Sequence, residues 1–155
     1  MNCVIYDSPI GPLSLVSNGA GLTHLLFDGA REASGVEDRV LSFARRQLDD
    51  YFAGKSKGFN LPLDPSGTEF QKRVWMALRD IPFGHTVAYA DIATRIGSPK
   101  AMRAVGAANG RNPIAIIVPC HRVIGADGSL TGFGGGLPRK QFLLALEQGQ
   151  RPLAA

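Results

Sequence analysis

The stretch "IAIIVPCHRVIG", from Ile114 to Gly125, runs from a row of apolar residues straight into a cysteine, a histidine and an arginine. The apolar start is typical of a buried strand, and Cys120 then stands where that strand ends. A free cysteine can be simple core filling. A reactive thiol instead needs an electropositive, partly exposed setting, and His121 and Arg122 favour such a setting here. The segment therefore bears on both the fold and the chemistry.

Length and composition indicate a globular protein. The chain has 155 residues, 45% of them hydrophobic, as expected for one domain or two small ones. The two cysteines, Cys3 and Cys120, imply no disulfide framework. No apolar run approaches the roughly 18 residues of a membrane span, and the N-terminus lacks the layout of a secretion signal. We expect a cytoplasmic protein without membrane association, or a nuclear one in a eukaryote.

Turn signals and periodicity predict a small sheet-and-helix domain at the N-terminus. Residues 1–27 alternate apolar and polar positions between turn signals, which predicts a three-stranded antiparallel meander. Apolar residues from Val36 to Phe52 then recur at helical spacing, and Gly54 follows as a stop. The proline-containing segment 60–67 is the best candidate linker. We therefore predict a first domain over residues 1–64.

The second predicted domain, residues 65–155, is helical, so the fold class is α+β. Thr68 and Gln71 have capping-box spacing before a helix through Trp75. Two further helical stretches, "YADIATRI" and "KAMRAVGAA", are separated by "GSP" and form either a helix-turn-helix or an ordinary helical hairpin of the core. A last helix spans residues 138–148.

One face of the stretch "KAMRAVGAA" combines basic residues with small side chains. Lys100, Arg103, Ala104 and Ala107 have the spacing of one helix face. Small side chains let a backbone approach something narrow and anionic, such as a DNA minor groove about 6 Å wide. Charge points the same way, because residues 65–155 carry a net charge of +6 and the preceding residues a net charge of −2. A basic surface without a partner remains an equal alternative.

Three interpretations of Cys120 compete: an inert core residue, the nucleophile of a cysteine hydrolase, and the acceptor of a group from a bound substrate. On an extended chain, neighbouring side chains point to opposite faces, so Cys120 and His121 meet only through a turn or a bridging water. This geometry suits a single deprotonation better than a protease. Glu147 lies at the unfavourable negative end of a helix dipole, where either an imidazolium or solvent compensates it.

Several motifs together resemble one known family. "PCHRVIG", with "NP" seven and eight residues before the cysteine, accompanies "YADIA", "RAVGAANG", "TGFGGGLPRK" and "LLALE". This combination is similar to the methylated-DNA–protein-cysteine methyltransferases, or O6-alkylguanine-DNA alkyltransferases. The resemblance covers the whole chain and is densest from Gly67 to Glu147. It implies a ribonuclease H-like N-terminal domain and a DNA-binding, alkyl-accepting C-terminal domain.

The resemblance also implies the reaction and its catalytic residues. The alkyl group of O6-alkylguanine, and of O4-alkylthymine, in duplex DNA is transferred once to Cys120, with base flipping and self-inactivation. His121 is the base acting through a water, and Glu147 orients His121. Asn112 braces the turn that carries the cysteine, and Tyr89 donates to N3 of the flipped guanine.

The binding residues follow from the same resemblance. Arg103 fills the gap in the duplex, and the backbones of Cys120, Val123 and Gly134 read the base edge. The expected DNA contacts are Tyr89, Ala90, Ser98, Lys100, Arg103 and Ala104, and the expected pocket residues are Val123, Phe133 and Gly134. The partner is then double-stranded DNA, bound in the minor groove by a monomer. Cooperativity along DNA stays open.

Two features depart from the family pattern. The zinc-containing relative uses N-terminal cysteines and histidines, whereas this N-terminal part has only Cys3 and His24, too few for a tetrahedral site. We expect neither metal nor cofactor. Phe133 and Gly134 replace a tyrosine and a serine of some relatives, which leaves tolerance of bulky alkyl groups open. The alternatives are a lesion sensor without transfer, against which the intact Cys120 argues, and then a cysteine hydrolase.

Overall fold

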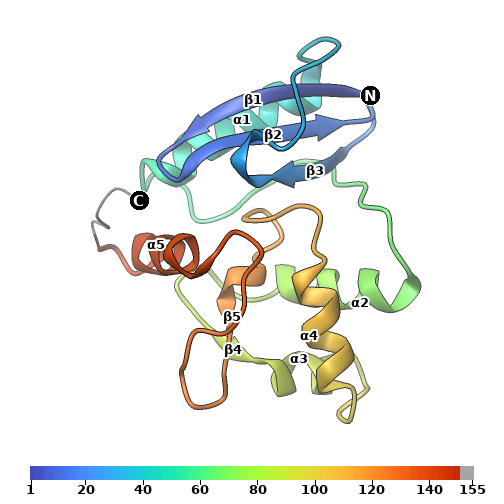
Figure 1. Ribbon diagram of the computed structural model, residues 1–155, viewed down its shortest axis with the longest axis vertical. Helices are drawn as coiled ribbons and strands as arrows, with labels where there is room; N and C mark the ends of the chain where they lie inside the picture. Colours follow the sequence, from blue (N-terminus) through green and yellow to red (C-terminus); the bar gives the residue numbers. More distant parts are fainter. Residues whose placement is uncertain (151–155) are drawn as a thin grey trace.

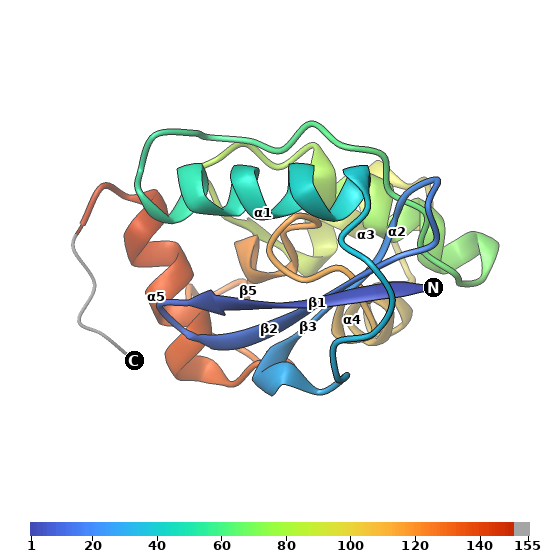
Figure 2. The ribbon, with the colours of Figure 1, turned by 90° about the horizontal axis from the view of Figure 1, so that it is seen from above.

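The computed structural model describes residues 1–150 and begins with an antiparallel sheet. The strands β1 (Asn2–Ser8), β2 (Gly11–Ser17) and β3 (Leu22–Leu26) pair in the order β1-β2-β3, which confirms the predicted meander. A short 3-10 helix, η1 (Phe27–Gly29), follows β3. The helix α1 (Arg39–Phe52) lies along one face of this sheet (Figure 2). The elements that follow α1 lie below the sheet in the view of Figure 1, next to its edge strand β3.

The start of α1 differs from the prediction. The predicted helix begins at Val36, but that side chain is 68% exposed and lies outside the helix. The carboxylate of Asp38 accepts the backbone N–H of Leu41 at 2.9 Å, so this aspartate is the N-cap and the helix begins at Arg39. The cap therefore overrides the apolar periodicity.

After residue 65, the second part of the chain begins with three short helices beside a two-stranded sheet. The helix α2 (Glu69–Arg79) opens with the predicted capping box of Thr68 and Gln71. The strand β4 (Val87–Ala88) leads into α3 (Tyr89–Arg95), and α4 (Met102–Gly110) follows. The second predicted stretch thus begins two residues later than expected, and Lys100 lies in the turn before α4. The indole N–H of Trp75 joins α2 to α4 through the carbonyl of Ala108, at 2.9 Å.

The segment from Ile114 to Pro119 is buried but is not a strand, so that prediction is wrong. Only Ile114 pairs with the sheet, through a single bridge to Leu25, and Ile116 has a positive φ of 73°. Asn112 closes the turn, because its side chain donates to the carbonyl of Val118 at 2.7 Å and accepts the N–H of Ile114 at 3.0 Å. A run of apolar residues indicates burial without distinguishing a strand from a compact turn.

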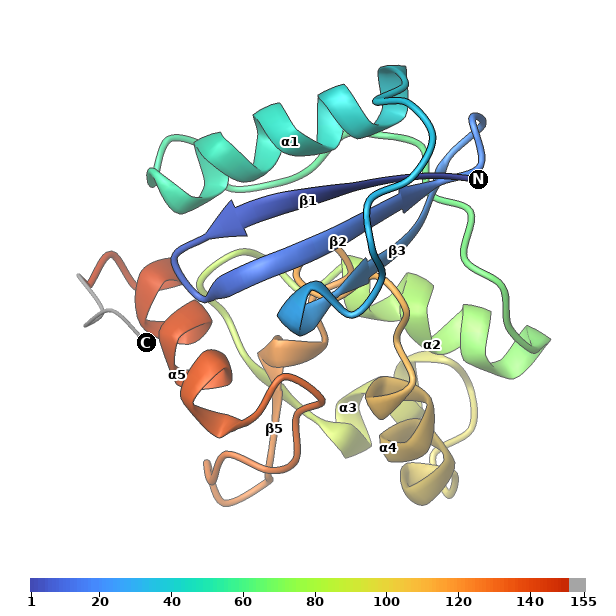
Figure 3. The same ribbon diagram turned by 45° about the horizontal axis from the view of Figure 1, so that its top comes forward.

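The chain then passes through the short 3-10 helix η2 (Cys120–Arg122) into β5 (Val123–Ile124), which pairs in parallel with β4. The last helix, α5 (Leu137–Glu147), lies beside the β1–β2 hairpin (Figure 3), where Arg139 donates to the carbonyl of Ile10 at 2.9 Å. One hydrophobic cluster includes residues of both parts. The boundary between residues 64 and 65 therefore stays a prediction, and residues 151–155 of the predicted second domain lie outside the described residues. No helix within residues 1–150 is long and apolar enough to cross a membrane.

Candidate active site

Cys120 opens η2 and lines a pocket of about 280 Å³. The wall comes from both parts of the chain and includes Phe27, Asp28, Asn109, Asn112, Phe133 and Gly134. The cysteine is only 6% exposed, so the expected partly exposed setting is wrong. Burial raises the pKa of the thiol, while a hydrogen bond from Asn112 and the positive charge of Lys140 act in the opposite direction. The resting thiol is therefore protonated and needs a base before it can act as a nucleophile.

His121 is the neighbouring base, and it is fully buried. Its Nε2 lies 2.6 Å from Oε2 of Glu147, whereas its Nδ1 has no hydrogen-bond partner among the described residues. Burial lowers the pKa of His121, and the carboxylate of Glu147 opposes this effect. A neutral imidazole that donates Nε2–H to the carboxylate keeps Nδ1 as a free acceptor. The tight turn of η2 replaces the extended backbone that we expected at this point.

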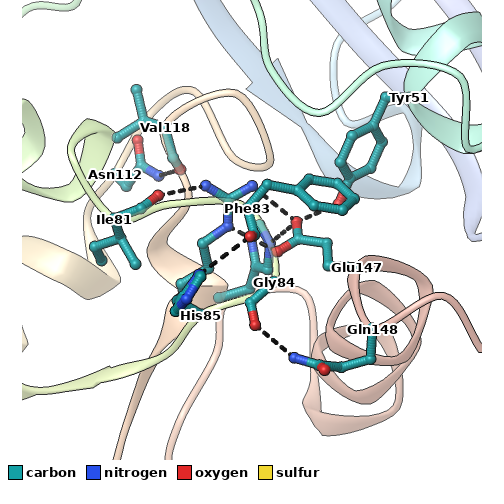
Figure 4. A network of polar contacts seen from close by, with 11 residues as sticks. Tyr51, Ile81, Phe83, Gly84, His85, Asn112, Val118, Glu147 and Gln148 are labelled. Carbon is teal, nitrogen blue, oxygen red and sulfur yellow. Dashed lines mark hydrogen bonds and ion pairs between the residues drawn. The ribbon is translucent and has the colours of Figure 1, made fainter.

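Glu147 is the last residue of α5, and its carboxylate accepts hydrogen bonds from three side chains (Figure 4). Besides His121, Arg122 donates through Nε to Oε1 at 2.7 Å and through Nη2 to Oε2 at 3.0 Å. The hydroxyl of Tyr51 donates to Oε2 at 2.6 Å. Although burial opposes it, the hydrogen bonds and charges of His121 and Arg122 lower the pKa of Glu147 to about 2. These partners, and not solvent, compensate the carboxylate at the negative end of the helix dipole.

Two of these partners escaped the sequence interpretation. Arg122 was expected to make the surroundings of the thiol electropositive, but it is buried and paired with Glu147, and it also donates to the carbonyl of Ile81 at 2.8 Å. Tyr51 lies at helical spacing with Leu48 on the core face of α1, so its burial was foreseeable. The sequence carries no signal for its contact with a residue 96 positions away.

Lys140 is the third missed residue. It is fully buried, and its ammonium donates to the carbonyl of Val123 at 2.7 Å and to that of Thr131 at 3.1 Å. The hydroxyl of Thr131 in turn lies 2.7 Å from the hydroxyl of Tyr89. Lys140 thus ties the glycine-rich loop to β5. Its spacing of seven from Glu147, on the same helix face, was a usable signal.

The other expected site residues fall into two groups. Phe133 and Gly134 line the pocket with Cys120, whereas Val123 does not, and its carbonyl already accepts from Lys140. The expected DNA contacts gather on α3, α4 and the turn between them, where Tyr89 and Ser98 are half-buried and Ala90, Lys100, Arg103 and Ala104 are exposed. Within residues 1–150, no group of three or more His, Cys, Asp or Glu side chains is arranged to hold a metal ion.

Comparison with known families covers nearly the whole chain. Residues 1–65 match the family described as 6-O-methylguanine DNA methyltransferase, ribonuclease-like domain, and residues 69–149 match its DNA binding domain. The chain belongs to the 6-O-methylguanine DNA methyltransferase family. Its enzyme class is that of the methylated-DNA–protein-cysteine methyltransferases, which confirms the resemblance seen in the sequence.

Individual relatives within this family match this chain along nearly their full length. The chain is 53% identical over 153 residues to the methylated-DNA–protein-cysteine methyltransferase of Methanosarcina acetivorans, covering 95% of this chain and 98% of the relative. The enzyme of Mycobacterium leprae is 55% identical over 155 residues, covering 97% and 94%. The crystal structure of Mycobacterium tuberculosis OGT in complex with DNA has a TM-score of 0.88 at 53% identity, covering 97% of this chain and 94% of that one. This structural similarity confirms the predicted α+β fold class.

Proposed function

We propose that this protein repairs DNA by moving the alkyl group of O6-alkylguanine onto its own Cys120. One observation carries the proposal: in a chain of this family, Cys120 lines a pocket and is followed directly by a buried His121 paired with Glu147. A nucleophile, a base and a group that orients the base are the parts that covalent catalysis needs.

The transfer is a displacement at the alkyl carbon. The thiol of Cys120 loses its proton to Nδ1 of His121 through a bridging water, and the thiolate attacks the alkyl carbon. The S–C bond forms as the C–O6 bond breaks, and the electron pair stays on the guanine oxygen. Tyr89, donating to N3 of the base, relieves the negative charge on the departing guanine. The guanine takes up one proton, which balances the proton that Cys120 gave to His121, and leaves as a neutral base. Glu147 keeps the imidazole in the tautomer with Nδ1 free.

The product explains why each molecule acts once. A thioether at Cys120 has no activated carbon for water to attack, unlike the thioester of a cysteine hydrolase. The same chemistry applies to O4-alkylthymine, whose alkyl group also sits on an oxygen of the ring. Phe133 and Gly134 then face the flipped base, because they share the pocket with the thiol.

DNA reaches the pocket through α3 and α4 in this proposal, which act as a helix-turn-helix. Exposed Arg103 and Ala104 at the start of α4 combine a cation with a small side chain, which suits close approach to a minor groove. A target atom inside the base stack requires extrusion of the base, and Arg103 fills the space left in the duplex. The DNA complex of the Mycobacterium tuberculosis relative supports DNA as the partner.

Intact-protein mass spectrometry after exposure to duplex DNA containing O6-methylguanine tests the proposal. We expect one methyl group per protein molecule, located on Cys120 and absent from Cys3. The variant Cys120→Ser should take up none while still binding DNA, because a serine hydroxyl stays protonated where a thiol ionises. DNA binding without any methylated protein would favour the lesion sensor, and demethylation beyond one equivalent would favour the hydrolase.

A further inference from the structure

Tyr51 brings the N-terminal part of the chain into direct contact with the candidate active site. It lies in the last turn of α1 and is fully buried. Its hydroxyl donates to Oε2 of Glu147 at 2.6 Å, the same oxygen that lies 2.6 Å from Nε2 of His121. Figure 4 shows the tyrosine ring pointing its oxygen at the carboxylate.

The direction of this hydroxyl is fixed by the packing of the ring. Aromatic rings of Phe52, Phe59 and Phe83 surround Tyr51, with centroids 5.2, 5.3 and 6.1 Å away. A buried phenol held on several sides cannot turn its oxygen toward solvent without opening the core. The packing of the ring therefore favours the hydrogen bond between the Tyr51 hydroxyl and Glu147.

We propose that Tyr51 is a positioning residue for the alkyl transfer, whose hydroxyl both fixes the carboxylate of Glu147 and withdraws negative charge from the oxygen that His121 uses. This inference rests on the proposed function. The residues assigned to the reaction so far all lie in the second part of the chain. Tyr51 would be the first residue of the N-terminal part that contributes to it.

The sign of the effect follows from the shared oxygen. A hydrogen bond to an ionised acceptor takes up part of its charge, so Oε2 attracts an imidazolium less strongly while Tyr51 donates to it. The other groups that face this pair are Arg122 on Glu147, and Lys140 and Arg122 on His121. Their charges do not change when the tyrosine oxygen is removed. Loss of the hydroxyl should therefore raise the pKa of His121.

The test is the pH dependence of single-turnover alkyl transfer by Tyr51→Phe, which removes one oxygen and keeps the ring. In the plot of transfer rate against pH, the rise on the acid side reports the first proton lost from the Cys120–His121 pair, and its midpoint is the apparent pKa of that loss. We expect the midpoint to move to higher pH by roughly half a unit to one unit, given the usual strength of a hydrogen bond to a charged group. On the acid side, the rate should fall about threefold to tenfold.

Tyr6→Phe is the matched control. Tyr6 is also buried in the N-terminal part, and its hydroxyl donates to Asp49 of the same helix α1 at 2.7 Å, away from Glu147. Its removal should leave the midpoint unchanged. Site-specific replacement of Tyr51 by 3-fluorotyrosine, a stronger donor of the same shape, should move the midpoint to lower pH. This opposite shift tests the proposal even if Tyr51→Phe folds poorly.

Two further measurements separate positioning from mere packing. The chain has three histidines, His24, His85 and His121, so an NMR titration resolves them, and only His121 should titrate at a higher pH in Tyr51→Phe. In a Glu147→Gln background, Tyr51→Phe should no longer move the profile, since its effect acts through the carboxylate. A wild-type protein that accepts no alkyl group would overturn the proposed function itself. A wild-type protein that does, with a superimposable Tyr51→Phe profile, would overturn this inference alone.

Discussion

The surroundings of Glu147 and the exposed surface of α3 and α4 use charge in opposite ways. Four hydrogen bonds from His121, Arg122 and Tyr51 hold the buried carboxylate. Arg103 and Lys100 instead stand exposed among small residues. A buried charge needs a partner within the protein, because removing it from water is costly. A charge on the surface is hydrated and stays available for a binding partner. In the proposed function, the buried groups carry out the alkyl transfer and the exposed surface binds duplex DNA.

The largest expected effect comes from breaking the interior. His121→Ala should slow alkyl transfer at neutral pH by about 10²- to 10⁴-fold, the usual contribution of a general base. The loss should be equal for duplex DNA and for free O6-benzylguanine, because the thiol is the same in both. Since burial already raises the pKa of Cys120, higher pH should restore part of the rate. Exposed His85 supplies the control, and His85→Ala should react at the wild-type rate on both substrates. A loss confined to duplex DNA would contradict this division of roles.

A second effect concerns stability in acid. The pKa of Glu147 falls from 4.5 to about 2 on folding, so its contribution is fully present above pH 4.5 and is lost as the pH falls through about 2. A difference of this size corresponds to about 3 kcal/mol in the free energy of unfolding. Urea unfolding of the wild type and of Glu147→Gln across this pH range measures it.

The wild-type curve should fall more steeply than that of Glu147→Gln by about this amount. The variant has a lower overall stability, because Arg122 then lacks a buried partner charge, so only the slopes are compared. Asp28, Asp38 and Asp127 also have lowered pKa values, but they are common to both proteins. Parallel curves would show that the carboxylate is not stabilised by its partners.

The sequence was sufficient for those elements whose signals are local. Alternation and turn residues gave the sheet, and the capping box at Thr68 and Gln71 gave the start of α2. Local signals failed at Ile114 to Pro119, where burial was right and the strand was wrong. A turn closed by the side chain of Asn112 depends on geometry that hydrophobic patterning does not encode.

The candidate site divides in the same way. Cys120, His121 and Glu147 were named from motifs, and the structure brings them together. Tyr51 and Lys140 were not named, because their roles arise from contacts across the fold. The thiol that was expected to be partly exposed is buried, and Arg122, expected to act on the thiol, is instead paired with Glu147. Pairing of buried charges is a tertiary property that neighbours in the sequence do not reveal.

The smallest effect should come from the surface. Arg103 is exposed at the start of α4, so Arg103→Ala removes no interior contact of the carboxylate and leaves the thiol chemistry intact. Reaction with free O6-benzylguanine should stay at the wild-type rate. Repair of duplex DNA should fall about tenfold to a hundredfold, because in the proposed function Arg103 fills the space that the extruded base leaves. Arg46→Ala, an exposed arginine on α1, is the control for charge alone and should repair duplex DNA normally. Equal losses on both substrates would place Arg103 within the chemistry and remove the distinction between interior and surface.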